Sequence, residues 1–316
     1  MPDKDLECFM EDRNKLCKLF QKVIVFIYVF TLACIVVGSI FQLCNTYIGG
    51  STHRSFFVMF AAFIVGSLIL FLYRCFKWIE NLSRKKLYFL TAVCFCLMAT
   101  VFTFLLSIWD IRPQTDEYAV IDGAASLLET PKLSADNVHA YLLGIYGNNY
   151  TLVLLYSCFI RLLFGLGIRN VLIPIRIINV ACILGSILLT WLITKEIRGL
   201  KTAVKVLILC MMNPLAYGLA FWAYSNTISM PVMMGIIYVA IRCYRAENVL
   251  ACTIYGILEG ILVILGYEIR PTAIFPFLSI GICFLQILLT KGKESINQNK
   301  KAIVKWVYIG FLTGAV

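Results

Sequence analysis

Long apolar runs, separated by short polar segments, recur along almost the whole chain. A last run begins at residue 303, and eight others lie at about 19–44, 55–76, 87–109, 171–194, 203–222, 227–245, 250–267 and 271–290. Helices of about 17–25 apolar residues cross the hydrocarbon core of a bilayer, which is roughly 30 Å thick. The pattern therefore predicts an all-α fold, a polytopic bundle of membrane helices.

The two ends of the chain depart from this pattern. The N-terminal tail mixes acidic and basic residues and lacks a signal-peptide core, which is typical of a cytosolic tail. The last run, 303–316, rises only about 21 Å as a helix, so we expect the sequence to be cut from a longer chain. We divide it into a tail with an N-terminal transmembrane hairpin, 1–86, and a C-terminally truncated membrane module, 87–316.

Basic residues predict the orientation of the helices. The segment 149–166 is apolar enough for another span, but it carries Arg161 at its centre, where a charge is costly in lipid. If this segment stays on the outer side, the predicted cytoplasmic loops hold 21 of the 28 Lys and Arg residues. If it crosses, several basic loops face outward, against the positive-inside rule. We therefore expect a juxtamembrane helix at 149–166 and a cytoplasmic N-terminus.

Composition excludes several classes of protein. The chain is 61% hydrophobic and 14% charged, whereas soluble domains are about 45–50% apolar and about 25% charged. The net charge of +11 falls mainly in predicted cytoplasmic loops, so we expect no nucleic-acid partner. The 13 cysteines lie mostly in apolar runs, and two histidines are too few for a multi-histidine metal site. We expect a multi-pass protein of a bacterial plasma membrane.

Acidic residues concentrate in the long loop predicted on the outer side. Six of the 17 acids fall between residues 110 and 136, at Asp110, Asp116, Glu117, Asp122, Glu129 and Asp136. A solvated loop often has this composition. However, Thr115 or Asp116 suits the cap of an amphipathic helix at 117–129, with apolar positions 121, 124, 125, 127 and 128 on one face.

Two kinds of chemistry suit an acid pair, Asp116 and Glu117, held at the membrane surface. A carboxylate there would take a proton from an acceptor hydroxyl, as a general base does. Alternatively, the two carboxylates would help to hold a divalent cation, with His139 of the same loop as another candidate ligand. The sequence assigns no cofactor with certainty.

Four further stretches lie on the predicted outer side. They are Asp-Glu at 116–117, Tyr-Gly-Asn-Asn at 146–149, Ile-Arg-Ile-Ile-Asn-Val at 175–180 and Tyr-Glu-Ile-Arg-Pro-Thr at 267–272. Together they resemble motifs of the type-C glycosyltransferases, and in particular of the protein O-mannosyltransferase and lipid A aminoarabinose transferase group. The resemblance covers about 87–316. The chain departs from the family where Gly147 replaces a usual proline, where Asn226 stands for a frequent Asp, and in lacking the large C-terminal portion.

The resemblance implies transfer of a sugar from a polyprenyl-phosphate donor to a lipid, glycan or protein acceptor on the outer face of the membrane. It implies that Asp116 is the catalytic base and that Glu117 orients it or helps to hold a metal. Arg270, together with Arg176, would neutralise the phosphate of the leaving group. Further candidate substrate contacts are Tyr146, Asn148, Asn149 and Asn226.

Ordinary structural roles compete with several of these assignments. An arginine such as Arg270 or Arg176 often anchors a helix end at the interface, and the segment 146–149 has turn chemistry. Trp222 and Tyr224 match an aromatic belt, although they would also stack on a sugar or a lipid chain.

Two further acids have predicted structural roles. Glu268 lies two residues before Arg270, which indicates an ion pair between them. Glu259 lies inside a predicted span between Gly256 and Gly260, so we expect helix packing around a protonated or paired carboxyl.

Two other functional classes fit the composition. A transporter or flippase for a lipid-linked sugar is expected to show inverted repeats and broken helices, and the sequence predicts neither. A catalytically inactive scaffold of the same fold is favoured by Asn226 and by the truncated end. The enzyme is the preferred interpretation.

Overall fold

The computed structural model of the chain describes residues 51–109, 111–113, 115–129, 147–246 and 248–290. Within these ranges the regular elements are helices and no strand is present, which confirms the predicted all-α class. The chain divides into two compact units. The first comprises residues 1–80 and 287–292, and the second comprises residues 81–286 and 293–316.

The first unit contributes one long helix to the described part of the chain, α2 (Ser51–Glu80). This helix contains the apolar run predicted at 55–76. Its 30 residues rise about 45 Å.

Four helices of the second unit are long and apolar enough to cross a membrane. They match the spans predicted at 87–109, 171–194, 227–245 and 250–267, and they are α3 (Arg84–Ile108), α7 (Leu172–Arg198), α10 (Ser225–Arg245) and α11 (Val249–Ile269). The prediction of several membrane-spanning helices is confirmed by their length and composition, which indicate a multi-pass membrane protein.

The span predicted at 203–222 is broken, with a bend of 57° between its two parts. It consists of α8 (Leu200–Met211), α9 (Pro214–Gly218) and the short 3-10 helix η3 (Leu219–Phe221). Pro214 has no backbone N–H and cannot continue the preceding helix. The side chain of Asn213 instead caps α9, because its Oδ1 accepts a hydrogen bond from Leu215 N at 3.1 Å. The expectation that the chain has no broken helix is therefore wrong.

The remaining described elements are short. They are α4 (Thr115–Glu129), η2 (Gly147–Asn149), α6 (Tyr150–Gly165), η4 (Pro271–Ala273) and α12 (Ile274–Thr290). Helix α4 confirms the helix predicted at 117–129. The apolar segment 149–166 forms the 16-residue helix α6, and the single span expected at 271–290 is divided between η4 and α12.

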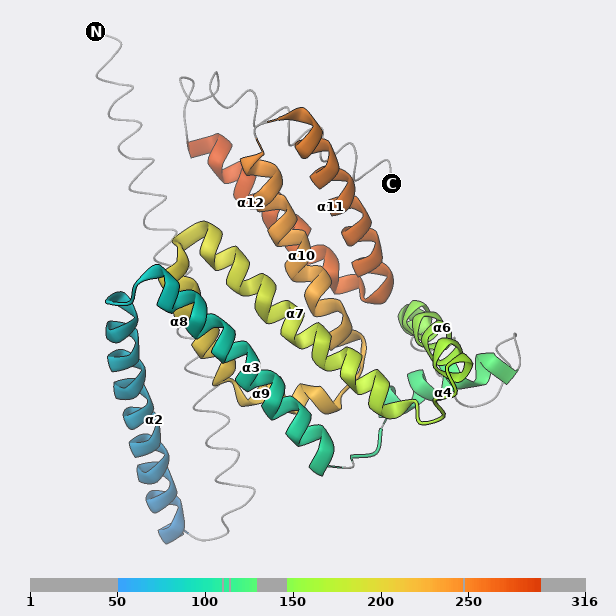
Figure 1. Ribbon diagram of the computed structural model, residues 1–316, viewed down its shortest axis with the longest axis horizontal. Coiled ribbons are helices and arrows are strands. Elements are labelled where there is room, and N and C mark those ends of the chain that lie inside the picture. The colour runs from blue at the N-terminus through green and yellow to red at the C-terminus, as the bar shows by residue number, and fades with distance from the viewer. Residues whose placement is uncertain (1–50, 110, 114, 130–146, 247, 291–316) are drawn as a thin grey trace. The chain divides into compact units, whose positions relative to one another are not determined.

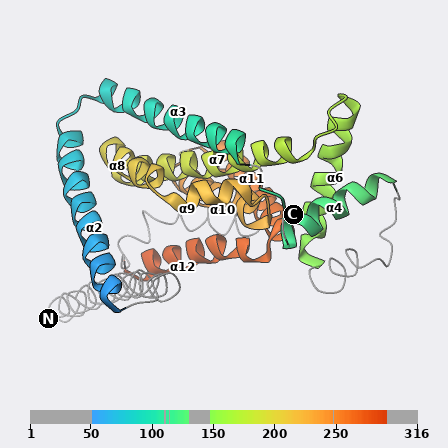
Figure 2. The same cartoon turned by 90° about the horizontal axis from the view of Figure 1, so that it is seen from below.

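Helix α7 occupies the middle of the second unit. It packs against α8 and α10, α10 packs against α11, and α3 packs against α8 (Figure 1). Helices α4 and α6 pack against each other beyond the N-terminal end of α7, as Figure 2 shows. The start of α4, the start of α6 and the turn that precedes α10 therefore gather in one region.

The close approach of α11 to its neighbours depends on a glycine. A methyl group at Gly266 would lie 3.0 Å from Ala273 Cβ and 3.2 Å from Val232 Cγ1. Because glycine leaves this space open, the C-terminal end of α11 packs directly against η4 and the first half of α10. This contact holds Arg270, the residue after α11, near the same region.

Candidate functional site

The candidate site is built around the segment 222–225, which joins η3 to α10 and is called the 222–225 turn below. Three of its residues, Ala223, Tyr224 and Ser225, are buried. Ala223 and Tyr224 belong to one hydrophobic cluster with side chains of α4, α6 and α7. Side chains from these same helices also bind the turn through hydrogen bonds.

Glu117 binds the turn from the first turn of α4. It is 2% exposed and shares the buried face of α4 with Val120, Ala124 and Leu127, which follow at helical spacing. Its Oε1 accepts a hydrogen bond from Ala223 N at 3.1 Å. The start of α4 is thereby tied to a segment that follows it by 106 residues.

The electrostatic setting of Glu117 combines opposing effects. Burial raises the pKa of the Glu117 carboxyl above its ordinary value, whereas the Ala223 N–H and the positive charge of Arg176 oppose that rise. The net pKa is raised, so Glu117 takes up a proton more readily than an exposed glutamate does.

Asp116 has a different environment, although it is the neighbouring residue. Successive residues of an α-helix differ in direction by about 100°, and Asp116 is half-buried where Glu117 is buried. The negative charge of Asp116 acts on the hydroxyl of Tyr224. The two adjacent acids therefore differ in position. Glu117 points inward and is bound by a backbone N–H, whereas Asp116 lies at the edge of the site.

Tyr224 is the side chain on which the site converges. Its hydroxyl accepts a hydrogen bond of 2.7 Å from Asn149 Nδ2, at the start of α6. Burial raises the pKa of the Tyr224 hydroxyl, and the hydrogen bonds from Asn149 and Ser225 lower it. The charge of Asp116 raises this pKa further, and that of Arg270 lowers it. Opposite charges from α4 and from the end of α11 thus act on one hydroxyl group.

Arg270 is held by its own turn. Its Nε donates a hydrogen bond of 2.9 Å to Thr272 Oγ1, which fixes the guanidinium plane. The ion pair predicted with Glu268 is not formed, because Glu268 Oε2 instead accepts a hydrogen bond from Thr151 Oγ1 at 3.1 Å. Within the described residues no carboxylate forms an ion pair with Arg270. The Nη groups of this half-buried side chain therefore suit an anionic ligand.

Arg176 of α7 has a structural environment. It is 4% exposed, its Nη2 donates a hydrogen bond to Ile111 O, and its guanidinium lies 5.7 Å from the centre of the Phe221 ring. These contacts join α7 to the segment before α4 and to η3. The sequence left two roles open for Arg176, which were to anchor a helix end or to bind a phosphate. These contacts favour the anchoring role.

Two side chains to which the sequence analysis gave no role in the site support the turn and the η3 helix before it. Asn179 Nδ2 donates hydrogen bonds to Leu219 O at 2.8 Å and to Ala220 O at 3.1 Å. The Tyr156 hydroxyl donates to Ala223 O at 3.2 Å. Asn179 belongs to the motif at 175–180, and an amide in an apolar run is a further sequence signal, since polar groups in a membrane helix need a partner.

Some of the candidate substrate and metal contacts lie outside the described residues. Tyr146 and His139 lie outside the described residues, as does the side chain of Asn148. Asn149 is buried in the site, whereas Asn226 is exposed in the first turn of α10.

The candidate metal ligands are not gathered by the part of the chain that the structure describes. There, no group of three or more His, Cys, Asp and Glu side chains lies close enough to hold an ion. Of the proposed set, Glu117 faces Ala223, and Asp116 remains the candidate carboxylate at the edge of the site.

Glu259 lies apart from this site, within α11. It is fully buried, and neither carboxyl oxygen has a hydrogen-bond partner. The paired alternative is therefore not realised among the described residues. The environment favours a neutral carboxyl, because burial of an unpaired charge is costly.

Comparisons with known protein families, with curated proteins and with solved structures found no match for this chain.

Proposed function

We propose that the protein is a membrane glycosyltransferase. It moves a sugar from a polyprenyl-phosphate donor to an acceptor hydroxyl on the outer face of the membrane. The proposal is supported by the start of α4, which carries Asp116 and is bound to the 222–225 turn through Glu117, and by Arg270, whose charge acts on Tyr224 of the same turn. Displacement of a phosphate requires a base and a positive charge, which the Asp116 carboxylate and the Arg270 guanidinium would supply.

In the proposed reaction, Asp116 takes the proton of the acceptor hydroxyl. The acceptor oxygen attacks the anomeric carbon of the sugar, and the bond from that carbon to the phosphate oxygen breaks. Polyprenyl phosphate leaves with the bonding electrons, so the configuration at the anomeric carbon inverts. Arg270 neutralises the charge that develops on the departing phosphate, where such stabilisation has its largest effect.

The other residues of the site hold these two groups in place. Glu117 fixes the start of α4 to the 222–225 turn, and Asn149 fixes Tyr224. Rotation of Asp116 away from the turn is thereby limited. This division of roles supports Glu117 as a positioning residue within the proposed mechanism.

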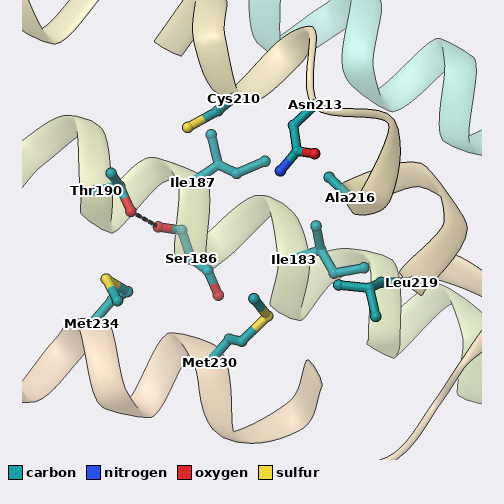
Figure 3. Close-up of a pocket in the computed structure, with 10 residues that line it drawn as sticks. All are labelled: Ile183, Ser186, Ile187, Thr190, Cys210, Asn213, Ala216, Leu219, Met230 and Met234. Atoms are coloured by element: carbon teal, nitrogen blue, oxygen red, sulfur yellow. Dashed lines mark hydrogen bonds between the residues drawn. The ribbon is translucent and has the colours of Figure 1, made fainter. Parts of the chain in front are cut away.

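A lipid-linked sugar transporter is the second candidate, because the span made of α8, α9 and η3 is broken. A cavity of about 200 Å³ lies beside the break (Figure 3). However, Ser186 and Thr190 of its lining donate their hydroxyl groups to carbonyls of their own helix, and Asn213 caps α9. The lining is mainly apolar and suits a hydrocarbon chain better than a sugar.

An assay of donor turnover tests the proposal. Membranes that contain the full chain are incubated with radiolabelled polyprenyl-phosphate mannose, glucose or arabinose and with membrane lipid as acceptor. The enzyme releases polyprenyl phosphate and labels an acceptor. A transporter leaves the donor intact but moves it to the other leaflet, and a scaffold does neither. Intact donor with every sugar, under conditions where the chain binds it, would count against the enzyme.

Replacement of Arg270 by Ala is expected to lower kcat/KM by about 100- to 1,000-fold, since one group that stabilises developing charge is removed. Arg270→Lys is expected to retain part of the activity, because it keeps the charge but loses the planar fork. Arg169→Ala is a matched control, since Arg169 is exposed and stacks on Phe164 at 5.1 Å. Equal activity of the Arg270→Ala and Arg169→Ala variants would remove Arg270 from the mechanism.

A further inference from the structure

Two cysteines face each other where α10 and α11 meet at their loop. The Cys243 and Cys252 sulfur atoms are 3.2 Å apart, and Cys243 Sγ lies 3.5 Å from Cys252 O. Their side chains are 0% and 3% exposed. Neither forms a disulfide. They form a small cluster of their own, together with the half-buried Ala246 and Tyr255.

We propose that Cys243 and Cys252 are a redox-active dithiol, which an oxidant of the low-molecular-weight disulfide class converts into a bond between α10 and α11. A disulfide bond is about 2.0 Å long, so the sulfur atoms need to approach by only about 1 Å. Each thiol lies within one turn of the loop end of its helix.

The reaction balances as two thiol–disulfide exchanges. One cysteine attacks a sulfur of the oxidant, forms a mixed disulfide and releases one small thiol. The second cysteine attacks the protein sulfur of that mixed disulfide, closes the intramolecular bond and releases the second small thiol. Two electrons pass from the cysteine pair to the oxidant, and the two thiol protons leave with its two halves.

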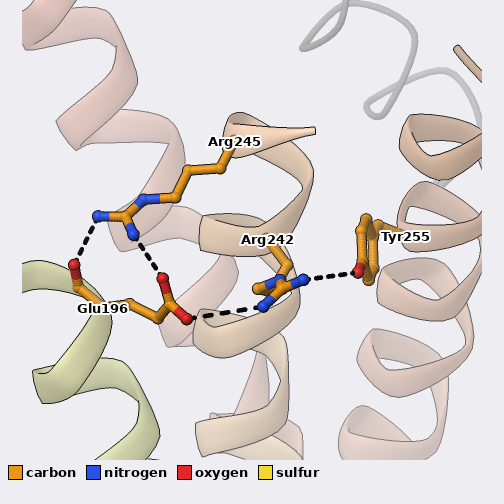
Figure 4. Close-up of polar contacts among 4 residues, drawn as sticks. All are labelled: Glu196, Arg242, Arg245 and Tyr255. Atoms are coloured by element: carbon orange, nitrogen blue, oxygen red, sulfur yellow. Dashed lines mark hydrogen bonds and ion pairs between the residues drawn. The ribbon is translucent and has the colours of Figure 1, made fainter. Parts of the chain in front are cut away.

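The polar residues beside the pair are typical of a helix end at an aqueous boundary. Arg242 and Arg245 of α10 both bind Glu196 of α7, and Arg242 also contacts Tyr255 (Figure 4). The arginine side chains are 41% and 48% exposed. A small oxidant that reaches this boundary is therefore separated from the thiols by only the last turn of α10 and the loop.

The consequence of the bond is a covalent clamp at one end of the α10–α11 pair. The opposite ends of these helices carry Tyr224 and Arg270. Closing the clamp restricts relative movement of the two helices. The proposal itself does not depend on glycosyl transfer, because the covalent bond is its readout.

Differential alkylation of the full chain in membranes tests the proposal. The membranes are treated with glutathione disulfide, or with dithiodipyridine as a small membrane-permeant disulfide. They are then quenched with N-ethylmaleimide and digested with trypsin under non-reducing conditions. Cleavage after Arg242 and Arg245 places the two cysteines on separate peptides. The Cys252 peptide runs from Ala246 to Lys291, because Arg270 is followed by Pro271, and it also contains Cys283. The expected product is the Cys243 peptide linked to a Cys252 peptide that carries N-ethylmaleimide on Cys283, two hydrogen masses lighter than the sum of these two peptides. Fragmentation of the product locates the link at Cys252.

Controls make the result specific. Cys243→Ser should abolish the linked product and leave Cys252 open to alkylation after denaturation. Cys182 and Cys210, which are thiols on α7 and α8, should remain alkylatable in the same sample. The proposal is overturned if both oxidants leave Cys243 and Cys252 unlinked, or if either cysteine is linked preferentially to another one.

Discussion

Replacement of Asp116 by Asn is expected to reduce sugar transfer by about 10²–10⁴-fold, the usual contribution of a general base. Asn has nearly the same shape, so the start of α4 should stay in place while the group that accepts the proton is lost. The measurement is single-turnover release of polyprenyl phosphate at saturating donor. Binding of the donor should change little, because Arg270, the proposed phosphate contact, is unchanged.

Asp122→Asn is the matched control for this experiment, since Asp122 is a half-buried acid on the same helix α4. It should keep activity close to that of the unchanged chain. If Asp116→Asn transfers sugar as fast as Asp122→Asn, Asp116 is not the base. The transfer reaction would then need another proton acceptor.

Replacement of Glu117 by Ala is expected to destabilise the protein and to lower its activity. The change leaves the buried Ala223 N–H without its partner, which typically costs about 1–3 kcal/mol. Glu117→Gln keeps an oxygen that accepts this hydrogen bond, so it should retain most of the stability and activity. Thermal unfolding in detergent and the transfer assay measure the two effects.

This comparison also separates positioning from direct chemistry. If Glu117 held a metal ion or moved a proton, the Gln variant would lose as much activity as Asp116→Asn. A small effect of Gln and a large effect of Ala support positioning. Loss of activity in both variants at unchanged thermal stability would contradict it.

The raised pKa of Glu117 adds a pH dependence to its effect on stability. Folding favours the protonated form of the Glu117 carboxyl. The contribution of this carboxyl to the free energy of unfolding is therefore fully present below its ordinary pKa of about 4.5 and is lost as the pH rises through the raised pKa. As the pH rises from about 4.5 through the raised pKa, the Tm of the unchanged chain should therefore fall relative to the Tm of the Glu117→Gln variant.

Much of the fold is visible in the sequence, because membrane helices must be long, apolar and internally hydrogen-bonded. The four spanning helices were predicted for this reason, whereas α4 was predicted from its cap and its apolar face. The break at Asn213 was not predicted, because hydropathy does not change there. The signal was local instead: an Asn that can cap a helix, directly followed by Pro214.

The site was predictable only in part. Acids at 116–117 and an arginine at 270 could be selected from their position, but their separate roles depend on the environment of each residue. Glu117 could have been recognised as buried, since 117, 120, 124 and 127 lie on one face of a helix. The contact of Ala223 with Glu117 had no sequence signal, because it is made by a backbone group 106 residues away.

The 222–225 turn also determines which part of the chain would have to be transferred to build the proposed site in another protein. Its backbone groups are bound by Glu117 from α4 and Tyr156 from α6, and its tyrosine hydroxyl by Asn149 before α6. A loop grafted onto another membrane protein would carry Asp116 but would leave these partners behind. The smallest transferable part is therefore the whole cluster of α4, α6, α7 and the start of α10, so variation is more readily accommodated around this cluster than within it.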